Sequence, residues 1–451
     1  WGTVSNIEPS RYDAGTAYIT VDFHQVNNRD PYVYKTLDYG MSWKSISSDV
    51  PRSVHSYAHC VREDSVRKGM LYLGTENALY VSFDDGDRWA SLQNNLPHAP
   101  VHDLALQGHF NDLVVGTSGR GFWILDDLTP LQQFTEEVQD SDVHLFAPRP
   151  AYRFQRLETT MDIPDHGHAG HNPPYGASIN YYLKAVPDGD VRIEVLDEGG
   201  RTIKVLPGTD NLGINRIWWN LRNEPSQRTK LRTSPLYAPH VQVGPEGWRP
   251  SRGRPISFRV APGTYTVKLV VDEQELTRPL VVEKDPKSAG TAADIQAQIK
   301  MLRELWDTAD AVANRINQIE SIRKQIQDLN ARLEGAEADS AIIAAGEDLD
   351  KKLVAVEGNL IQLKHIAGQD FLRWPGRFYS KLGRLAGEVG STDYPPTAQQ
   401  IEVHEMYKTQ WAAYQAQLDE VLEKDLSAFN DLLKQHEIPH VMPRAAQEDG
   451  G

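Results

Sequence analysis

The feature that most constrains this chain is an eight-residue pattern that occurs twice, 46 residues apart. Thr36–Trp43 and Ser82–Trp89 share the form S/T-x-D-x-G-x-x-W, and each follows a short run of strand-forming residues. A third pair of strand-like runs, 113–117 and 121–125, ends without the pattern. Short strands that recur with a period of about 40–50 residues predict the blades of a β-propeller.

The repeated pattern has the chemistry of a hairpin turn. Its aspartates are expected to accept hydrogen bonds from backbone amides within the turn. Its glycines supply the positive φ angle that the turn requires, and its tryptophans are expected to pack between neighbouring sheets. We therefore predict a structural role for Asp38, Gly40, Trp43, Asp84, Gly86 and Trp89.

Residues 1–130 hold only two to three such units, whereas propellers usually close with four or more blades. An open set of blades leaves a sheet face and unpaired strand edges exposed. We therefore expect upstream propeller blades, in the same chain or in a partner chain, to pack against this segment.

The remainder of the chain divides into segments that differ in composition and in the spacing of their apolar residues. After a linker or wrapping segment at 131–177, strand-like runs at 178–285 predict a further β domain. Residues 291–440 predict an antiparallel helical bundle, and 441–451 a disordered tail. The fold class is thus mainly β plus α and multidomain: a partial propeller, a β domain and a helical bundle. The predicted strands are Ala17–Asp22, Tyr32–Thr36, Met70–Gly74, Ala78–Phe83, Asp112–Thr117, Gly121–Leu125, Ile179–Ala185, Val191–Asp197, Thr202–Leu206, Asn215–Leu221, Ile256–Ala261 and Gly263–Asp272.

Apolar residues at steps of three and four predict one long amphipathic helix to Leu333 and two further helices, over 349–367 and 407–433. Thr291 with Asp294, and Thr397 with Gln400, have the spacing of N-terminal capping boxes. The aromatic-rich connection 371–394 is expected to wrap one end of the bundle, and the Pro- and Arg-rich insertion 223–255 to lie on the surface.

Composition excludes several classes of protein. The chain carries 62 acidic and 47 basic residues, a net charge of −15, and no basic stripe that would suit nucleic acid. The sequence contains no stretch of about 18 apolar residues, so no membrane span is predicted. The single cysteine, Cys60, rules out an internal disulfide without fixing the compartment. The chain begins at Trp1 without a signal-peptide pattern, so it is expected to be truncated at its start.

Two residues are candidate ligand contacts. Arg120, between two glycines, is expected to enter the inner strand of the last blade, where it lines the channel or forms a salt bridge at the rim. Trp219, beside Trp218, offers a surface for stacking on a sugar. Because neighbouring side chains in a strand point to opposite faces, only one of the two can be exposed.

One segment has the composition of a metal site. Its four donors lie within seven residues and could surround Zn²⁺ if the intervening glycines let the loop curl; the alternative is a surface loop. These donors are Asp165, His166, His168 and His171.

Two further groups have simpler alternatives. Cys60 beside His59 invites a thiolate–imidazole pair, with a buried small side chain as the alternative. Arg62, Glu63 and Asp64 could face a channel or lie in a solvated loop. No cofactor is predicted.

Four segments carry a resemblance to a known family: 115–130, 172–177, 213–222 and 260–269. They resemble large bacterial secreted proteins of the BNR-repeat "glycosyl hydrolase" or sortilin-like family, and the repeated pattern resembles their Asp box. The resemblance implies the C-terminal part of such a protein, in which 178–285 form an immunoglobulin-like β-sandwich similar to the domain of the flagellar hook-capping protein. It also implies a secreted, periplasmic or cell-surface location, and it supplies no set of catalytic residues.

The leading functional hypothesis is an extracytoplasmic binding or scaffold protein whose completed propeller takes a glycan or a peptide. The alternative is a sialidase-like glycoside hydrolase with most catalytic residues in upstream blades. A third hypothesis makes the chain one subunit that pairs its open blade edge with a partner.

Overall fold

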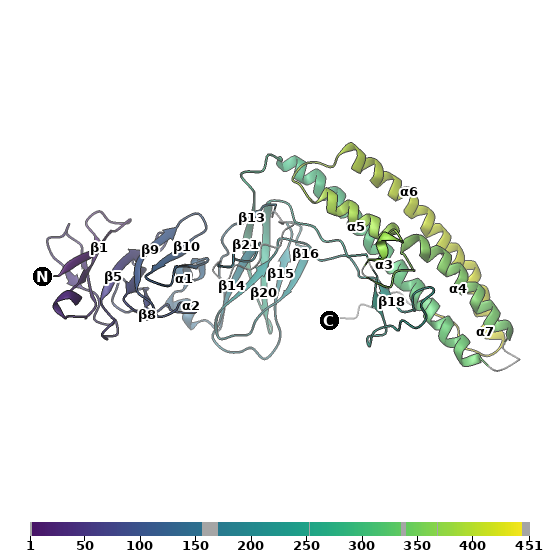
Figure 1. Cartoon of the computed structure of the whole chain (residues 1–451), viewed down its shortest axis with the longest axis horizontal. Helices are drawn as coiled ribbons and strands as arrows, with labels where there is room; N and C mark the ends of the chain where they lie inside the picture. The colour runs from purple at the N-terminus through teal and green to yellow at the C-terminus, as the bar shows by residue number, and fades with distance from the viewer. Residues whose placement is uncertain (1, 156–169, 252, 335–339, 368, 444–451) are drawn as a thin grey trace.

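The computed structural model describes residues 2–155, 170–251, 253–334, 340–367 and 369–443. The chain is mixed β and α, with several sheets towards the N-terminus and a helical region at the C-terminus. These parts follow one another along a single long axis, from the N-terminal sheets at one end to the helices at the other (Figure 1).

The N-terminal part contains three successive antiparallel sheets, each with its strands in chain order. The first sheet contains β1 (Thr3–Pro9), β2 (Ala17–Asp22), β3 (Tyr32–Thr36) and β4 (Lys44–Ser45), with a short 3₁₀ turn, η1 (His24–Val26), after β2. The second contains β5 (Ala58–Glu63), β6 (Leu71–Thr75), β7 (Leu79–Ser82) and β8 (Ala90–Ser91). The third contains β9 (Val101–Gln107), β10 (Asp112–Thr117) and β11 (Phe122–Leu125). That these sheets are propeller blades stays a prediction.

The second sheet is buried on both faces. Side chains alternate along a strand, so Leu71 and Leu73 of β6 pack with the first sheet while Tyr72, between them, packs with the third. Each of these three side chains is 0% exposed. The three sheets are therefore held face to face by apolar packing.

Polar contacts join the third sheet to the next part of the chain. Asp127, just after β11, is 2% exposed and accepts hydrogen bonds from Ser178 Oγ and, at 3.1 Å, from Asn180 Nδ2. Arg216 donates to the carbonyls of Asp126 and Asp127 at 2.9 and 3.0 Å. Two short helices, α1 (Thr129–Gln133) and α2 (Glu136–Asp140), lie in the connecting segment.

Two sheets then pack on one hydrophobic core. One contains β12 (Val143–Leu145), β14 (Ala177–Leu183) and β17 (Gly213–Trp219). The other contains, in spatial order, β13 (Ala151–Arg153), β21 (Gln274–Lys284), β20 (Gly263–Val271), β15 (Val191–Leu196) and β16 (Thr202–Pro207). Both sheets contribute to the same core, so they form a sandwich, whereas its immunoglobulin-like topology stays a prediction.

One predicted strand of this region is wrong. Residues 256–261 form no strand and make only an isolated antiparallel bridge, Arg222 to Arg259. Their apolar residues Ile256 and Phe258 pack into the helical core instead, which explains why an alternating pattern occurs without a strand. A small ribbon, β18 (Lys230–Leu231) with β19 (Arg249–Pro250), lies in the insertion that precedes them.

The helical region begins with α3 (Ala292–Leu333), a 42-residue helix about 60 Å long. Both predicted capping boxes are confirmed, at Thr291 with Asp294 and at Thr397 with Gln400. The remaining elements are α4 (Ser340–Leu360), η3 (Asp370–Leu372), α5 (Phe378–Val389), α6 (Ala398–Glu420), the π-helical η4 (Val421–Leu426) and α7 (Ser427–Gln435). The connection 371–394 thus contains a helix, α5, which was not predicted because its glycines are poor helix formers.

The insertion 223–255 is anchored on α3 by a buried charge network. Arg323, 3% exposed, pairs with Glu320 at 3.0 Å and with Glu357 of α4 at 2.8 Å. Glu320 also accepts hydrogen bonds from the backbone amides of Arg232 and Thr233. Complete burial raises the pKa of Glu357 well above its usual range. The network ties α3, α4 and the insertion together.

The sandwich offers a matched pair of substitutions on adjacent residues. Trp219→Ala removes a fully buried ring and its hydrogen bond to the Arg222 carbonyl, so it is expected to destabilise the fold by about 3–5 kcal/mol. Trp218→Ala, on the half-buried opposite face, is expected to cost clearly less. Urea unfolding followed by far-UV circular dichroism measures both, and equal losses would contradict the assignment of Trp219 to the core.

Candidate functional site

The strands of the three N-terminal sheets are connected by turns at their two opposite ends, and each of these ends is called an edge of the sheets. The two repeated turns, Thr36–Trp43 and Ser82–Trp89, join the third strand to the fourth at one edge. The opposite edge, named here the distal edge, contains the β6–β7 turn, the β10–β11 turn and the beginnings of β5 and β9. Side chains from different sheets meet at this distal edge.

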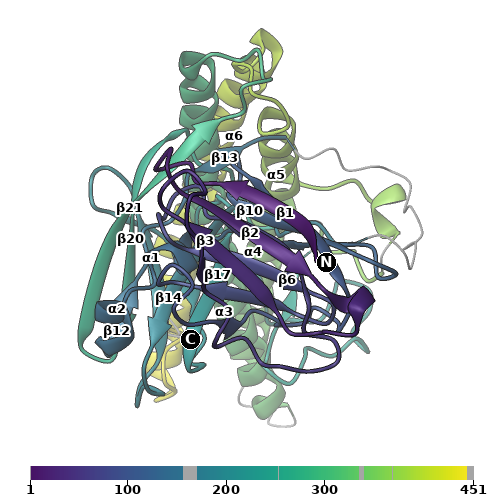
Figure 2. The ribbon, with the colours of Figure 1, turned by 90° about the vertical axis from the view of Figure 1, so that its left-hand side faces the viewer.

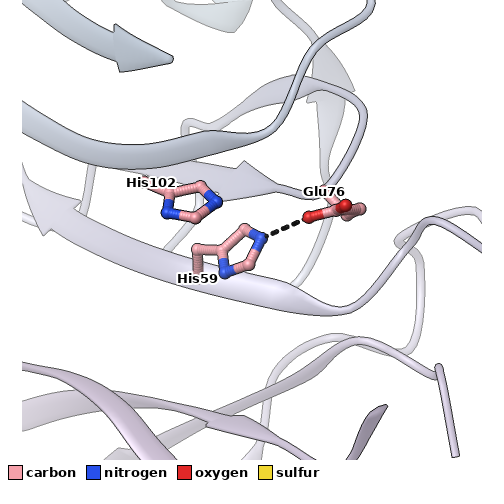
Figure 3. Close-up of side chains that lie close together, drawn as sticks. All are labelled: His59, Glu76 and His102. Atoms are coloured by element: carbon pink, nitrogen blue, oxygen red, sulfur yellow. Dashed lines mark hydrogen bonds and ion pairs between the residues drawn. The ribbon is translucent and has the colours of Figure 1, made fainter. Parts of the chain in front are cut away.

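Three of them form a cluster, shown in Figure 3. His59 lies on β5, Glu76 in the turn after β6, and His102 on β9 of the next sheet. His59 Nε2 lies 2.8 Å from Glu76 Oε2, and the rings of His59 and His102 lie 4.3 Å apart between centroids. His59 and Glu76 are mostly buried, with side-chain exposures of 14% and 23%, whereas His102 is exposed.

Aromatic packing holds this cluster in place. Tyr57 packs edge-on against the His59 ring at 5.3 Å and stacks on His24 of the first sheet at 5.0 Å. The backbone amide of Glu76 donates to the Tyr57 carbonyl at 3.1 Å, which fixes the turn. Burial, with a hydrogen bond to Glu76, raises the pKa of Tyr57 to about 12. Four rings, of His24, Tyr57, His59 and His102, therefore run across all three sheets.

The electrostatics of His59 favour a neutral imidazole. Burial lowers the pKa of His59, and the hydrogen bond that His59 makes to the Glu76 carboxylate only partly opposes this effect. A neutral imidazole with a free ring nitrogen is the form in which histidine binds metals.

The donor set fits a zinc-type ion. Each of the three residues offers one ligand atom, and these atoms lie within 4.8 Å of one another. Tetrahedral zinc bonds of about 2.0–2.2 Å place ligand atoms roughly 3.4 Å apart, a spacing that small side-chain movements reach from the present one. Two histidines and one carboxylate leave a fourth coordination position for water or another ligand.

The structure places Arg120 on the same distal edge. It lies in the β10–β11 turn between Gly119 and Gly121, both with positive φ, and not in the inner strand where the sequence analysis expected it. Its side chain is exposed, and its carbonyl accepts a hydrogen bond from Trp123 Nε1 at 3.1 Å. Arg120 is therefore accessible at the edge that carries the histidine cluster.

Trp219 does not offer a ligand surface. Its side chain is 0% exposed and packs edge-on against Tyr265 in the sandwich core, with ring centroids 5.6 Å apart. The prediction of sugar stacking at Trp219 is therefore wrong: of the two neighbouring tryptophans, Trp219 is the one that points inward.

The predicted metal loop is described only at His171, which is exposed. Asp165, His166 and His168 lie outside the described residues.

The residues around β5 have structural roles. Burial raises the pKa of the Cys60 thiol to about 12, and its Sγ contacts the Val101 carbonyl at 3.7 Å, while the neighbouring His59 bonds to Glu76. Glu63 and Asp64 are both 0% exposed. The Asp64 carboxylate accepts hydrogen bonds from two backbone amides of the following turn, at 2.7 and 2.8 Å. The Arg62 side chain donates hydrogen bonds to both β1 and β9 and so connects these strands.

The two repeated turns have nearly identical hydrogen bonds. Asp38 Oδ1 accepts the amide of Ser42 at 2.8 Å, and Asp84 Oδ1 accepts the amide of Arg88 at the same distance. Gly40 and Gly86 have φ angles of 84° and 91°. Hydrogen bonds from the Ser42 hydroxyl, the Ser42 amide and the Thr36 hydroxyl hold the pKa of Asp38 at about 2.

The sequence analysis missed the cluster because Glu76 and His102 lie far from His59 in the chain. One signal was available: His59 and His102 each occupy the second position of the first strand of their sheet. Aligning the repeats on these strands would have paired them.

Comparisons with known proteins add little to this geometry. Neither a protein-family model nor a curated protein matches the chain. Among solved structures it is similar to the extracellular domain of a hybrid two-component system from B. thetaiotaomicron, with 11% identity, 62% of this chain covered and a TM-score of 0.22. It is also similar to a GH74 enzyme from Niastella koreensis, with 12% identity, 61% of this chain covered and a TM-score of 0.23. A third similar structure is the GH74 xyloglucanase from Xanthomonas campestris, with 12% identity, 62% of this chain covered and a TM-score of 0.21.

The chain spans 31%, 38% and 38% of the length of these three structures. At such low TM-scores the similarity does not establish a shared fold. None of the helices in the described residues combines the length and apolar composition needed to cross a membrane.

The hydrogen bonds of the first repeated turn predict an unusual titration of Asp38. Asp38 should titrate near pH 2, and Ser42→Ala should raise its pKa towards the ordinary value of about 3.9, because the hydroxyl and its bond to the carboxylate are lost. Since the folded-state pKa is the lower one, the turn's contribution to stability is present above about pH 4 and is lost as the pH falls towards 2. Carboxyl carbon chemical shifts followed by NMR in the unmodified chain and in Ser42→Ala test this.

The histidine cluster predicts binding of one zinc-type ion. Co²⁺ serves as the spectroscopic probe, in a variant with His166, His168 and His171 changed to alanine so that the His-rich loop does not contribute. His102→Ala should weaken binding at least tenfold, whereas His55→Ala, which changes an exposed histidine outside the cluster, should leave it unchanged. Equal affinity in the two variants would mean that the cluster does not bind the metal.

Proposed function

We propose that this chain is the C-terminal part of an extracytoplasmic β-propeller protein that binds a glycan or peptide and acts as a scaffold. Upstream blades, in the same chain or in a partner, complete the propeller. The sandwich and the helical region then extend from its last blade.

The observation that carries this proposal is the contrast between two equivalent tryptophans. Trp89 of the second Asp-box turn is 7% exposed, and its Nε1 donates to the Ile46 carbonyl of the preceding sheet at 2.7 Å. Trp43, at the same position of the first turn, is 40% exposed, and its Nε1 donates only to Gly40 of its own turn at 3.1 Å. Trp43 therefore lacks the preceding sheet that Trp89 has.

The glycines of the two turns repeat this contrast. A Cβ added to Gly86 would lie 2.7 Å from Ile46 of the preceding sheet, whereas a Cβ added to Gly40 would meet only its own Trp43. The first sheet lies at the end of the molecule, with no element of the described chain in front of it (Figure 2). Its exposed apolar side chains would be covered by a further blade. They include Val4, Ile7, Tyr39, Met41 and Trp43.

The distal edge supports a binding role. His59, Glu76 and His102 lie at this edge, and so does the exposed Arg120, so the edge combines candidate metal ligands, a cation and aromatic rings. Such groups suit the hydroxyl and carboxylate groups of a glycan or a peptide.

The hydrolase alternative gains no support from the carboxylates named in the sequence analysis. Most glycosidases need two accessible carboxylates about 5–10 Å apart, and sialidases need an accessible carboxylate beside a tyrosine nucleophile. Glu63 and Asp64 are buried, so they do not meet that requirement. Hydrolysis of glycosides would depend on carboxylates from upstream blades, and assays on the full-length protein distinguish it from binding alone.

The paired tryptophans provide the test. In this chain alone, Trp89→Ala should destabilise the N-terminal sheets by about 3–5 kcal/mol, and Trp43→Ala by less than about 1 kcal/mol. In the assembled protein, Trp43→Ala should also be strongly destabilising or should weaken association with the upstream blades. Chemical unfolding and the native mass of protein from its natural source measure these effects. If the chain is a stable monomer in its natural source, with no upstream blades, the proposal is wrong.

A further inference from the structure

A pocket with an unusual charge lies between the sandwich and the helical region. It has a volume of about 350 Å³ and is bounded by the loop 253–259, by α5 and by Arg153 of β13. Five arginines line it: Arg153, Arg222, Arg254, Arg259 and Arg384. No Asp or Glu is among its lining residues in the described part of the chain, although the whole chain has a net charge of −15.

Within the described residues, only two of the five arginines have a carboxylate partner. Arg153, 1% exposed, pairs with Asp393 and donates to Gln298 Oε1 at 2.9 Å, but its Nε has no hydrogen-bond partner. Arg384 pairs with Glu388 at 3.1 Å on the exposed surface of α5. The remaining three arginines form no ion pair within the described residues.

Two of these three are held directly opposite each other. Arg222 and Arg259 form an isolated antiparallel bridge, and like charges at opposing positions of such a pair are destabilising. Arg259 donates only to neutral groups, the carbonyls of Phe154 and Gly390 and the side chain of Gln155. The half-buried Arg222 side chain makes no hydrogen bond to the described residues. Burial and the nearby Arg259 charge lower the pKa of Arg222.

Partly buried cations without counterions are costly, because the lost hydration is not replaced. Guanidinium groups are planar forks that bind carboxylate or phosphate oxygens through paired, charge-assisted hydrogen bonds. The pocket also has room for a ligand: Gly383 and Gly387 of α5, and Gly390 directly after it, line the pocket without side chains. Its volume lies at the lower end of the range for small-molecule sites.

We propose that this pocket binds the oxyanion group of a small molecule, either a carboxylate or a phosphate, with Arg222 and Arg259 as the central contacts. The ligand supplies the negative charge that the protein does not place between these arginines. The site lies away from the distal edge and does not depend on the proposed propeller function.

Isothermal titration calorimetry of the full chain tests the proposal, with inorganic phosphate and glucuronate as the two probes. At least one probe should bind with one site per chain, and the tighter of the two identifies the phosphate or the carboxylate as the preferred group. Arg222→Gln should weaken binding at least tenfold, and Arg222→Lys, which keeps the charge but loses the fork, should also weaken it. Arg201→Gln, which changes an exposed arginine of the sandwich outside the pocket, is the matched control.

A second variant keeps the test valid if Arg222 variants fold poorly. A Cβ at Gly387 would meet no atom within 4 Å, so Gly387→Glu places a carboxylate at the pocket without a steric clash. This variant should raise the melting temperature and abolish binding of both probes, whereas Gly387→Gln should not raise it as much. The proposal is overturned if neither probe binds the unmodified chain, or if Arg222→Gln and Arg201→Gln bind alike.

Discussion

A sheet with apolar side chains on both faces is stable only between two neighbours, and the second sheet of this chain has that character. Leu71 and Leu73 need the first sheet, and Tyr72 needs the third, so the stack cannot be reduced to a single sheet. The same packing brings β5 and β9 close enough for His59 and His102 to meet. The distal edge and its cluster thus depend on face-to-face burial.

Much of the secondary structure follows from local patterns. The predicted strands Ala17–Asp22 and Tyr32–Thr36 match β2 and β3, and apolar spacing with a capping box predicted α3. The first strands of the sheets were harder to predict. In β1 only Glu8 is buried, so the strand lacks the alternation that a pattern search needs. Backbone pairing with β2, which is not visible in the sequence, makes it a strand.

The candidate sites depend still more on tertiary structure. Trp218 and Trp219 are identical in type, and alternation alone does not say which of them points inward. His59, Glu76 and His102 come from two sheets, and the pocket arginines come from β13, two loops and α5. Residue type made each a candidate for chemistry, but only the packing of distant segments shows which of them act together.

The contacts of Asp127 have a mechanical consequence. Because buried side chains of β14 and an arginine of β17 hold the end of the third sheet, the connection between sheets and sandwich does not act as a loose tether. The buried pair of Arg153 and Asp393 gives the next junction, between sandwich and helices, a similar connection. A force applied to the helices would therefore be transmitted through these hydrogen-bonded junctions to the stacked sheets, so the chain would respond as one stiff rod.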